Sequence, residues 1–414
     1  MSGAAGSDVP AAEGSRSPEG TASVDTRRAY AASGVDVAAG ERAVDLMRAR
    51  VAATHGPEVL SGLGSFGAAV ALPAGMREPV LVGATDGVGT KTALARSLRR
   101  FDTIGVDLVA MCADDVACEG ARPLFFLDYV AAGHVVPLDV AALVEGVARG
   151  CEVAGCALVG GETAEHPGIM EPDEFDLAGF CVGVAERGEL FDRSALQAGD
   201  ALLGIASTGL HANGFSLVRQ QLAAWDLDPG APYLDVVRRM LGDVAAGRLG
   251  AEEPEHVLAT LGEVLLTPSR IYARDVLGLR DALAGRGQPL LGLAHITGGG
   301  LPGNLPRAVP DGLAVECWLG SWPVPSVFRV MAALGRIDGP ELRATFNCGI
   351  GMAAVVRHEG VDAALGWLAS RGLRAWRIGR LVPAGAAAGT GAGASLREMA
   401  APRYIEVEVE AEVR

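Results

Sequence analysis

Hydrophobic and polar positions divide the chain into two halves, each alternating short apolar runs with longer helix-like segments. Apolar runs of about four to eight residues between turns are typical of strands, and longer amphipathic runs of helices. In the first half, the expected elements are helices over 39–54 and 139–154 and strands over 79–82, 124–129, 157–159 and 175–184. Polarity then rises over 186–199 before a new apolar run begins at Ala201. This alternation predicts a mixed α/β fold (α+β type).

The second half repeats the alternation. A helix is expected after Asn213, and strands are expected over 349–356 and 376–381. A chain of 414 residues has enough material for two cores. We therefore place two mixed α/β domains at 26–190 and 198–382.

The two ends of the chain differ in composition from these domains. Residues 1–25 are small, polar and acidic, and they predict a disordered leader. Residues 383–414 begin as an Ala/Gly-rich linker. Within this tail, 404–413 alternate apolar residues with Glu, so the segment either pairs as an edge strand or stays unpaired.

Charge and cysteine content limit the classes of function. The formal net charge of −15 argues against a nucleic-acid-binding surface. No uncharged apolar run is long enough to span a membrane. Seven cysteines, an odd number without C-x-x-C pairs, are typical of reduced thiols in the cytoplasm. We expect a cytoplasmic protein with neither nucleic acid nor membrane as partner.

A glycine-rich turn over 84–91 (Ala-Thr-Asp-Gly-Val-Gly-Thr-Lys) follows an expected strand. Gly87 and Gly89 allow backbone N–H groups to approach an anion closely. Lys91 supplies positive charge for phosphate, and Asp86 can hold Mg²⁺ through oxygen. The alternative is an ordinary strand-to-helix turn with an exposed lysine, and the glycine spacing is not that of a Walker A loop.

More carboxylates follow apolar segments further along the chain. Asp114 and Asp115 end an apolar stretch, and Glu162 stands at the tip of a Gly-Gly turn. An isolated Asp-Asp pair usually caps a helix. Acids gathered at strand ends are also what Mg²⁺ bound to nucleotide phosphates requires, provided that a cation or Lys91 offsets their repulsion.

Three further segments have both a structural and a functional interpretation. His211 and Asn213 precede an expected helix, where they either cap it or form an anion site. The run His-Ile-Thr-Gly-Gly-Gly over 295–300 is either a backbone nest for phosphate or an ordinary loop. Residues 62–67 match G-x-G-x-x-G, but no strand precedes them. We interpret this last segment as a flexible glycine-rich flap.

Taken together and in order, these motifs are far more specific than any one of them. The chain resembles the phosphoribosylformylglycinamidine cyclo-ligases, also called AIR synthetases, over about 30–381. The matching segments are 34–36, 62–67, 86–91, 102–105, 120–129, 159–165, 179–184, 211–216, 268–272, 295–300 and 345–349. The leader and the tail lie outside this resemblance.

The resemblance implies ATP-dependent ring closure of formylglycinamidine ribonucleotide to aminoimidazole ribonucleotide, with release of ADP and phosphate, in purine biosynthesis. It implies an AIR synthase-like fold with ATP and Mg²⁺ as cofactors. It also implies a homodimer that forms through the sheets of the N-terminal domain, 26–190. ATP would bind near the subunit interface, under the glycine flap.

The same resemblance implies roles for individual residues. Asp86, Asp115 and Glu162 would be the Mg²⁺ ligands, while Lys91, His211 and Asn213 would be the catalytic set. The residues implied for ATP binding are Gly62, Gly64, Gly67, Asp86, Gly87, Gly89, Thr90, Lys91, Asp114 and Asp115. Asp114 stands where the family commonly has Asn, so it either coordinates the metal or remains a hydrogen-bonding neighbour.

Two other classes of function remain as alternatives. A phosphoryl-transfer relative such as thiamine-phosphate kinase or selenophosphate synthetase would share the fold. The latter typically has a reactive cysteine near its N-terminal glycine loop, whereas the first cysteine here is Cys112. The other alternative is a non-catalytic nucleotide-binding or scaffold protein. In such a protein we would expect the acids or Lys91 to be missing.

Overall fold

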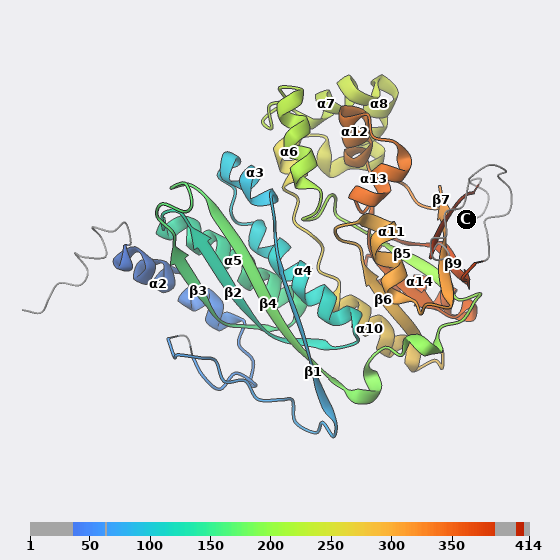
Figure 1. The fold of residues 1–414 in the computed structure, drawn as a ribbon, viewed down its shortest axis with the longest axis horizontal. Helices are drawn as coiled ribbons and strands as arrows, with labels where there is room; N and C mark the ends of the chain where they lie inside the picture. The colour runs from blue at the N-terminus through green and yellow to red at the C-terminus, as the bar shows by residue number, and fades with distance from the viewer. Residues whose placement is uncertain (1–35, 63, 386–402, 410–414) are drawn as a thin grey trace, which may run out of the picture.

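A computed structural model of the chain describes residues 36–62, 64–385 and 403–409. The protein has two mixed α/β domains, with the N-terminal domain on the left and the C-terminal domain on the right of Figure 1. The expected leader and most of the linker lie outside the described residues. None of the helices that are described is long and apolar enough to cross a membrane.

The N-terminal domain contains a four-stranded sheet in the order β1-β4-β2-β3. Its strands are β1 (Pro79–Gly87), β2 (Arg122–Ala132), β3 (Ala157–Glu165) and β4 (Phe175–Glu186). β4 is antiparallel to β1 and β2, and β2 is parallel to β3. The two edges of the sheet are therefore β1 and β3.

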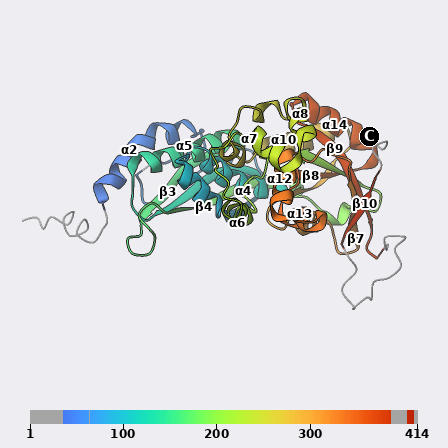
Figure 2. The ribbon, with the colours of Figure 1, turned by 90° about the horizontal axis from the view of Figure 1, so that it is seen from above.

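Among the described residues, the helices of this domain cover one face of its sheet. They are α2 (Val37–Ala53), α3 (Lys91–Leu98), α4 (Ile104–Cys118) and α5 (Pro137–Ala154). In Figure 2, α2 and α5 lie above β3 and β4. The uncovered face carries Leu81, Tyr129 and Phe180, with exposed fractions of 59%, 40% and 43%. Successive strand residues point to opposite faces, so these apolar side chains alternate with the buried ones.

α4 is the central helix of the molecule. Gly105 and Gly146 let it approach α5 closely: a Cβ atom on Gly105 would lie 2.2 Å from the backbone N of Val147. On its other sides α4 contacts the sheet and, from the C-terminal domain, α10 and β6. Almost every residue of α4 is buried, as its apolar composition predicts. The polar residues that α4 carries therefore lie between the two domains.

The C-terminal domain contains a six-stranded sheet in the order β10-β7-β9-β5-β8-β6. Its strands are β5 (Ala201–Ala206), β6 (Leu290–His295), β7 (Leu313–Leu319), β8 (Ile350–Val356), β9 (Ala375–Pro383) and β10 (Tyr404–Glu408). The α-helices are α6 (Phe215–Ala224), α7 (Tyr233–Leu241), α8 (Asp243–Glu252), α9 (Leu261–Leu265), α10 (Ala273–Ala284), α11 (Gly300–Asn304), α12 (Ser326–Gly335), α13 (Gly339–Thr345) and α14 (Val361–Ser370). Short 3₁₀ turns are η1 (Arg187–Glu189), η2 (Arg193–Ala195), η3 (Pro254–His256), η4 (Leu305–Ala308) and η5 (His358–Gly360).

Two clusters of buried apolar side chains support the fold. The larger one is continuous from the N-terminal domain into the C-terminal domain, for example from Leu108 of α4 to Val276 of α10. The smaller one lies within the C-terminal domain and includes Ile350 and Ile378. Because the larger cluster crosses the domain boundary, the two domains hold each other in place around α4. At the far edge, Tyr404–Glu408 pair with β7 in parallel, which resolves the alternatives for the tail in favour of an edge strand.

Candidate active site

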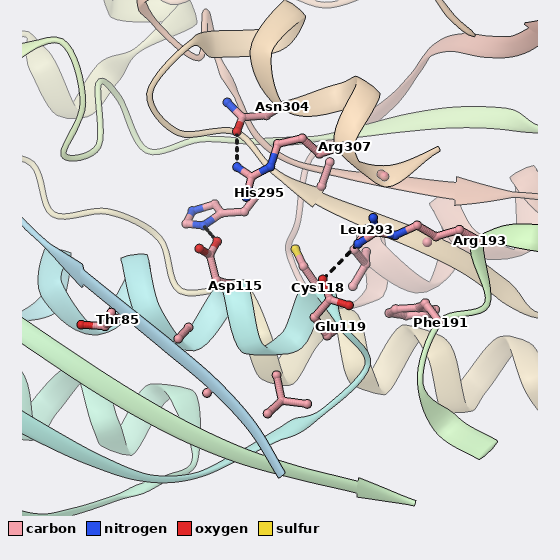
Figure 3. A pocket seen from close by; sticks show the side chains of 16 residues that line it. Thr85, Asp115, Cys118, Glu119, Phe191, Arg193, Leu293, His295, Asn304 and Arg307 are labelled. Carbon is pink, nitrogen blue, oxygen red and sulfur yellow. Dashed lines mark hydrogen bonds and ion pairs between the residues drawn. The ribbon is translucent and has the colours of Figure 1, made fainter. Parts of the chain in front are cut away.

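A cavity of about 310 Å³ lies between the two domains. It is bounded by β1 and α4 from the N-terminal domain and by β6 and η4 from the C-terminal domain. Figure 3 shows its polar side chains: Asp115 and His295 face each other, Arg307 lies beside Asn304, and Arg193 lies beside Glu119. A cleft between two domains with convergent polar groups is the usual form of a small-molecule site.

Two carboxylates approach each other at this domain boundary. Asp86 is the last residue but one of β1, and Asp115 belongs to α4. Partial burial raises the pKa of Asp86, and the neighbouring charge of Asp115 raises it further. The Asp115 side chain is 40% exposed. The two carboxylates come from separate elements and repel each other. A divalent cation bound between their oxygen atoms would offset this repulsion.

His295 brings the C-terminal domain to this acid pair. It is the last residue of β6, and its Nδ1 atom lies 3.0 Å from Oδ1 of Asp115. Burial by itself lowers the pKa of His295, but the hydrogen bond to Asp115 and the charges of Asp114, Asp115 and Asp86 raise it overall. The surrounding acids therefore favour the protonated, positively charged form of His295 at the edge of the cavity.

The glycine turn after His295 is held from beneath by a buried side chain. Gly299 and Gly300 have positive φ angles of 89° and 57°, which favour glycine. The Nδ2 atom of Asn304 donates to the carbonyl oxygens of Gly298 and Gly300 at 3.1 and 2.9 Å. Arg307 in turn donates to Oδ1 of Asn304 at 3.1 Å. The turn and Arg307 therefore form one connected unit along the cavity.

The loop before α6 contributes Asn213 to this region but keeps His211 buried. A Cβ atom on Gly298 would lie 3.4 Å from Oδ1 of Asn213, so this amide faces the glycine turn. His211 is 2% exposed and accepts the backbone N–H of Thr208 on its Nε2 atom at 3.2 Å. Burial lowers the pKa of His211 well below its usual value. A neutral, enclosed imidazole supports the loop, so the structure places His211 differently from the expected catalytic group.

Lys91 also differs from its expected place at a phosphate. Its ammonium lies 2.8 Å from Asp107, and neither side chain has any exposed surface. The same Nζ atom donates to the carbonyl oxygens of His211 and Thr267, each at 2.9 Å. α3 turns its first residue inward, and these three acceptors neutralise the ammonium and hold it. Lys91 therefore joins the two domains and has no free donor facing a ligand.

Asp114 is likewise a structural residue and not a ligand-binding one. Its Oδ1 atom accepts the backbone N–H groups of Tyr272 and Ala273, both at 2.8 Å, at the start of α10. The residue has no exposed surface, and burial raises its pKa to about 7. Of the two alternatives for this position, the structure has the hydrogen-bonding neighbour. Helix N-termini have unpaired N–H donors, which such an acceptor satisfies.

Glu162 does not join Asp86 and Asp115 within one chain. β1 and β3 are opposite edges of the sheet, roughly 14 Å apart at about 4.8 Å per strand. The register aligns Asp86 with Gly161, so the next residue, Glu162, points to the other face. Among the residues that the structure describes, no group of three or more His, Cys, Asp and Glu is arranged to hold a metal. The expected three-carboxylate site is therefore incomplete in a single copy.

The glycines expected to bind ATP fall into two groups. Gly87, Gly89 and Thr90 follow Asp86 directly, and Thr90 Oγ1 lies 3.0 Å from Ser216 Oγ at the start of α6. Gly62, Gly64 and Gly67 lie in the exposed loop that precedes β1, near the opposite end of that strand (Figure 1). β1 has nine residues, so its ends are about 27 Å apart. The structure therefore does not bring the two groups together in one chain.

Some residues of the site were missed by sequence reasoning. Arg193, Asn304 and Arg307 line the cavity, and Asp107 holds Lys91. Asn304 lies four residues after Gly300, at a helical spacing that could have linked it to the glycine turn. Asp107 lies in the same apolar stretch as the Asp-Asp pair. Because a buried carboxylate needs a cation or hydrogen-bond donors, an acid in this stretch indicated a buried partner such as a lysine.

The comparisons with known proteins cover most of the chain. Models of the AIR synthase related protein, N-terminal domain and C-terminal domain, match residues 68–185 and 197–392. The phosphoribosylformylglycinamidine cyclo-ligase of Sorangium cellulosum (strain So ce56) is 48% identical over 357 residues, covering 86% of this chain and 96% of the relative. The chain belongs to this cyclo-ligase family. The enzyme of that name from Geobacillus kaustophilus (strain HTA426) is 45% identical over 370 residues, or 88% and 99% of the two chains.

Solved structures agree with the fold of the family. Thiamine-monophosphate kinase from Stenotrophomonas maltophilia K279a superposes with a TM-score of 0.55 at 21% identity, covering 83% of this chain and 93% of that chain. The hydrogenase maturation protein HypE in complex with ATP superposes with a TM-score of 0.53 at 19% identity, covering 84% and 87%. At such low identity the likeness establishes the shared fold alone.

Proposed function

We propose that this protein catalyses the ATP-dependent cyclisation of formylglycinamidine ribonucleotide to aminoimidazole ribonucleotide, with release of ADP and phosphate. One observation carries the proposal. Asp115 from the N-terminal domain meets His295 from the C-terminal domain at the interdomain cavity, and the charges of both act on Asp86 at the end of β1. They do so in a chain that is 48% identical to a named cyclo-ligase over 357 residues.

The proposed chemistry has two stages. The formyl amide oxygen of the substrate takes the γ-phosphoryl group of ATP, which leaves ADP. A substrate nitrogen then attacks the activated carbon, forming the C–N bond of the ring while the C–O bond breaks and phosphate departs. Phosphoryl transfer needs orientation and charge neutralisation more than a covalent nucleophile. This agrees with a site that offers acids, a histidine and arginines but no exposed reactive thiol among the described cysteines.

Asp86 and Asp115 are the residues that we propose to hold Mg²⁺. Partial burial is the main cause that raises the pKa of Asp86, and the charge of Asp115 adds to it; a shared cation would relieve this repulsion. When bound, the metal would neutralise charge on the ATP phosphates. The exposed residues Gly89 and Thr90 adjoin these acids and would offer backbone N–H groups to the same phosphates. HypE, which was solved with ATP, has the same fold and supports ATP as the nucleotide.

We further propose that the site is completed in a homodimer. The uncovered face of the N-terminal sheet bears Leu81, Tyr129 and Phe180, whose exposure favours burial against a second copy. Two-fold packing of these faces, with β1 of one copy over β3 of the other, would bring Glu162 of the partner subunit to the face of β1 that carries Thr85, one residue from Asp86. A Cβ atom on Gly62, Gly64 or Gly67 would meet nothing within 4 Å, so this part of the flap offers open surface to a second copy.

The substrate side of the proposed site is the cavity itself. Arg193 and Arg307 supply positive charge that suits the phosphate of a ribonucleotide. Asn213 faces the glycine turn and offers an amide to the polar part of the substrate. The seven cysteines are all free thiols, which supports a location in the reducing cytoplasm.

A coupled assay of ADP formation tests the proposed function. We expect ADP release with formylglycinamidine ribonucleotide and Mg²⁺, and only background release without the ribonucleotide. Thiamine phosphate serves as the competing phosphoryl acceptor in a parallel reaction. Equal ATP turnover with and without the ribonucleotide, or turnover with thiamine phosphate alone, would overturn the proposal.

A further inference from the structure

The C-terminal strand β10 and the residue before it form hydrogen bonds and an ion pair with the part of the C-terminal domain that lines the interdomain cavity. Arg403, directly before β10, donates from one guanidinium nitrogen to the carbonyl oxygens of Pro306, at 2.8 Å, and Val309. These two carbonyls bracket Arg307 and Ala308, which both line the cavity. Arg403 also pairs with Asp311 at 3.2 Å. The guanidinium therefore fixes the backbone on either side of Arg307.

A second contact from β10 reaches the glycine turn through α13. Glu406 forms a two-pronged ion pair with Arg343, with distances of 2.6 and 2.5 Å, and both side chains are largely buried. The carbonyl oxygen of Arg343 lies directly under the glycine turn: a Cβ atom on Gly300 would be 1.9 Å from it. Only glycine permits this approach. A displacement of α13 would therefore push directly on Gly300.

The two contacts converge on one side of the cavity. Arg403 fixes the backbone around Arg307, Glu406 fixes the helix beneath Gly300, and Asn304 links the turn to Arg307. Along its length, β10 pairs in parallel with β7 and is anchored by Tyr404 in the smaller apolar cluster. The match to the C-terminal domain of the family ends at residue 392, so β10 lies beyond it.

We propose that Arg403 and Glu406 of the C-terminal strand are positioning residues for the substrate side of the active site. They hold Arg307 and the glycine turn in the arrangement that receives the ribonucleotide. This inference rests on the proposed function. It gives the tail a role in the enzyme, although the tail lies beyond the match to the family model.

The first test compares two glutamates of the same strand. Glu406→Gln removes the charge that holds Arg343, and Glu408→Gln changes an exposed residue of β10 as the matched control. We expect Glu406→Gln to raise the KM for the ribonucleotide by at least about fivefold, while kcat and the KM for ATP change by less than about twofold. Glu408→Gln should behave as the wild type.

The second test removes the strand and returns it. A chain that ends at residue 402 should show the same selective rise in the KM for the ribonucleotide. A synthetic peptide of residues 403–409 should restore the wild-type KM, and the same peptide with Gln for Glu406 should restore it poorly. Rescue by the peptide distinguishes positioning from a general loss of folding, because a misfolded domain would not regain its KM.

The outcomes separate this inference from the proposed function. If the wild type is inactive on the ribonucleotide, the proposed function fails. If the wild type is active and Glu406→Gln either leaves both KM values unchanged or raises them equally, the positioning role is wrong. A lower melting temperature with unchanged kinetics would also overturn it, because the strand would then contribute only to stability.

Discussion

The ammonium group of Lys91 lies 2.8 Å from the carboxylate of Asp107, and both side chains are completely buried. The pair joins α3 to α4, and the two carbonyl bonds of Lys91 connect it to the loops around His211 and Thr267 of the other domain. Taking two charges out of water is costly, so their mutual contact and hydrogen bonds are what make the arrangement tolerable. Lys91 therefore affects the site through the relative placement of the domains.

Lys91→Met is expected to destabilise the protein strongly. It leaves the Asp107 carboxylate buried without its cation, which typically costs about 3–5 kcal/mol of unfolding free energy. Urea denaturation measures the loss, and the double variant Lys91→Met/Asp107→Leu should recover much of it. A Lys91→Met variant that keeps its stability but loses ATP affinity would contradict this structural role. It would show that Lys91 contacts the ATP phosphates directly.

Asp115→Asn should strongly weaken Mg²⁺-dependent ATP binding while leaving the fold intact. The side chain is 40% exposed, so its removal disturbs little packing, whereas the metal loses an anionic ligand. Isothermal titration of Mg²⁺–ATP should show affinity lower by at least about tenfold for Asp115→Asn and for Asp86→Asn. The control is Asp173→Asn, an acid with a 71% exposed side chain outside the cavity. Unchanged affinity in both site variants would contradict the proposed metal site.

Much of the fold was accessible from local patterns. The helix expected over 139–154 is α5, which begins with Pro137 and ends before Gly155 in a left-handed conformation. The strands expected over 124–129 and 175–184 lie within β2 and β4. Proline at the start of a helix and glycine after its end act locally, and so does strand alternation. The fold class was therefore predictable from residues that are neighbours in sequence.

The roles of single charged residues were not accessible in this way. Asp114 meets the start of α10 at a separation of 158 residues, and Lys91 meets Thr267 at a separation of 176. A lysine after a glycine turn has the same local sequence whether it faces a phosphate or a buried acid. The place of Glu162 depends on the strand order, which puts β1 and β3 at opposite edges. Only tertiary packing decides these cases.

Asp128 should make stability depend on pH. It is buried on β2, and burial raises its pKa from 3.8 to about 7. Between these values the folded state keeps a proton that the unfolded state releases, so the unfolding free energy falls as pH rises from about 4 to about 7. Urea denaturation should show that Asp128→Asn removes a slope of up to about 1.4 kcal/mol per pH unit. Parallel curves for the wild type and the variant would contradict this.

Phe180→Asp is expected to convert the enzyme to an inactive monomer. Phe180 stands on the uncovered face of the N-terminal sheet with 43% of its surface exposed. A charge there would be buried in the proposed dimer at high cost. Sedimentation equilibrium and the ADP assay measure the two effects, and Leu258→Asp, at a 95% exposed position of the C-terminal domain, is the control. An active monomer would exclude a site completed by Glu162 of the partner subunit.

The most direct test of the account follows one oxygen atom through the reaction. Formylglycinamidine ribonucleotide is labelled with ¹⁸O in its formyl amide group and is incubated with the protein, ATP and Mg²⁺. If that oxygen is phosphorylated and then leaves on ring closure, the label must appear in the inorganic phosphate, with one ADP formed for each ring closed. Phosphate without the label, or ADP formed without ring closure, would contradict the central claim.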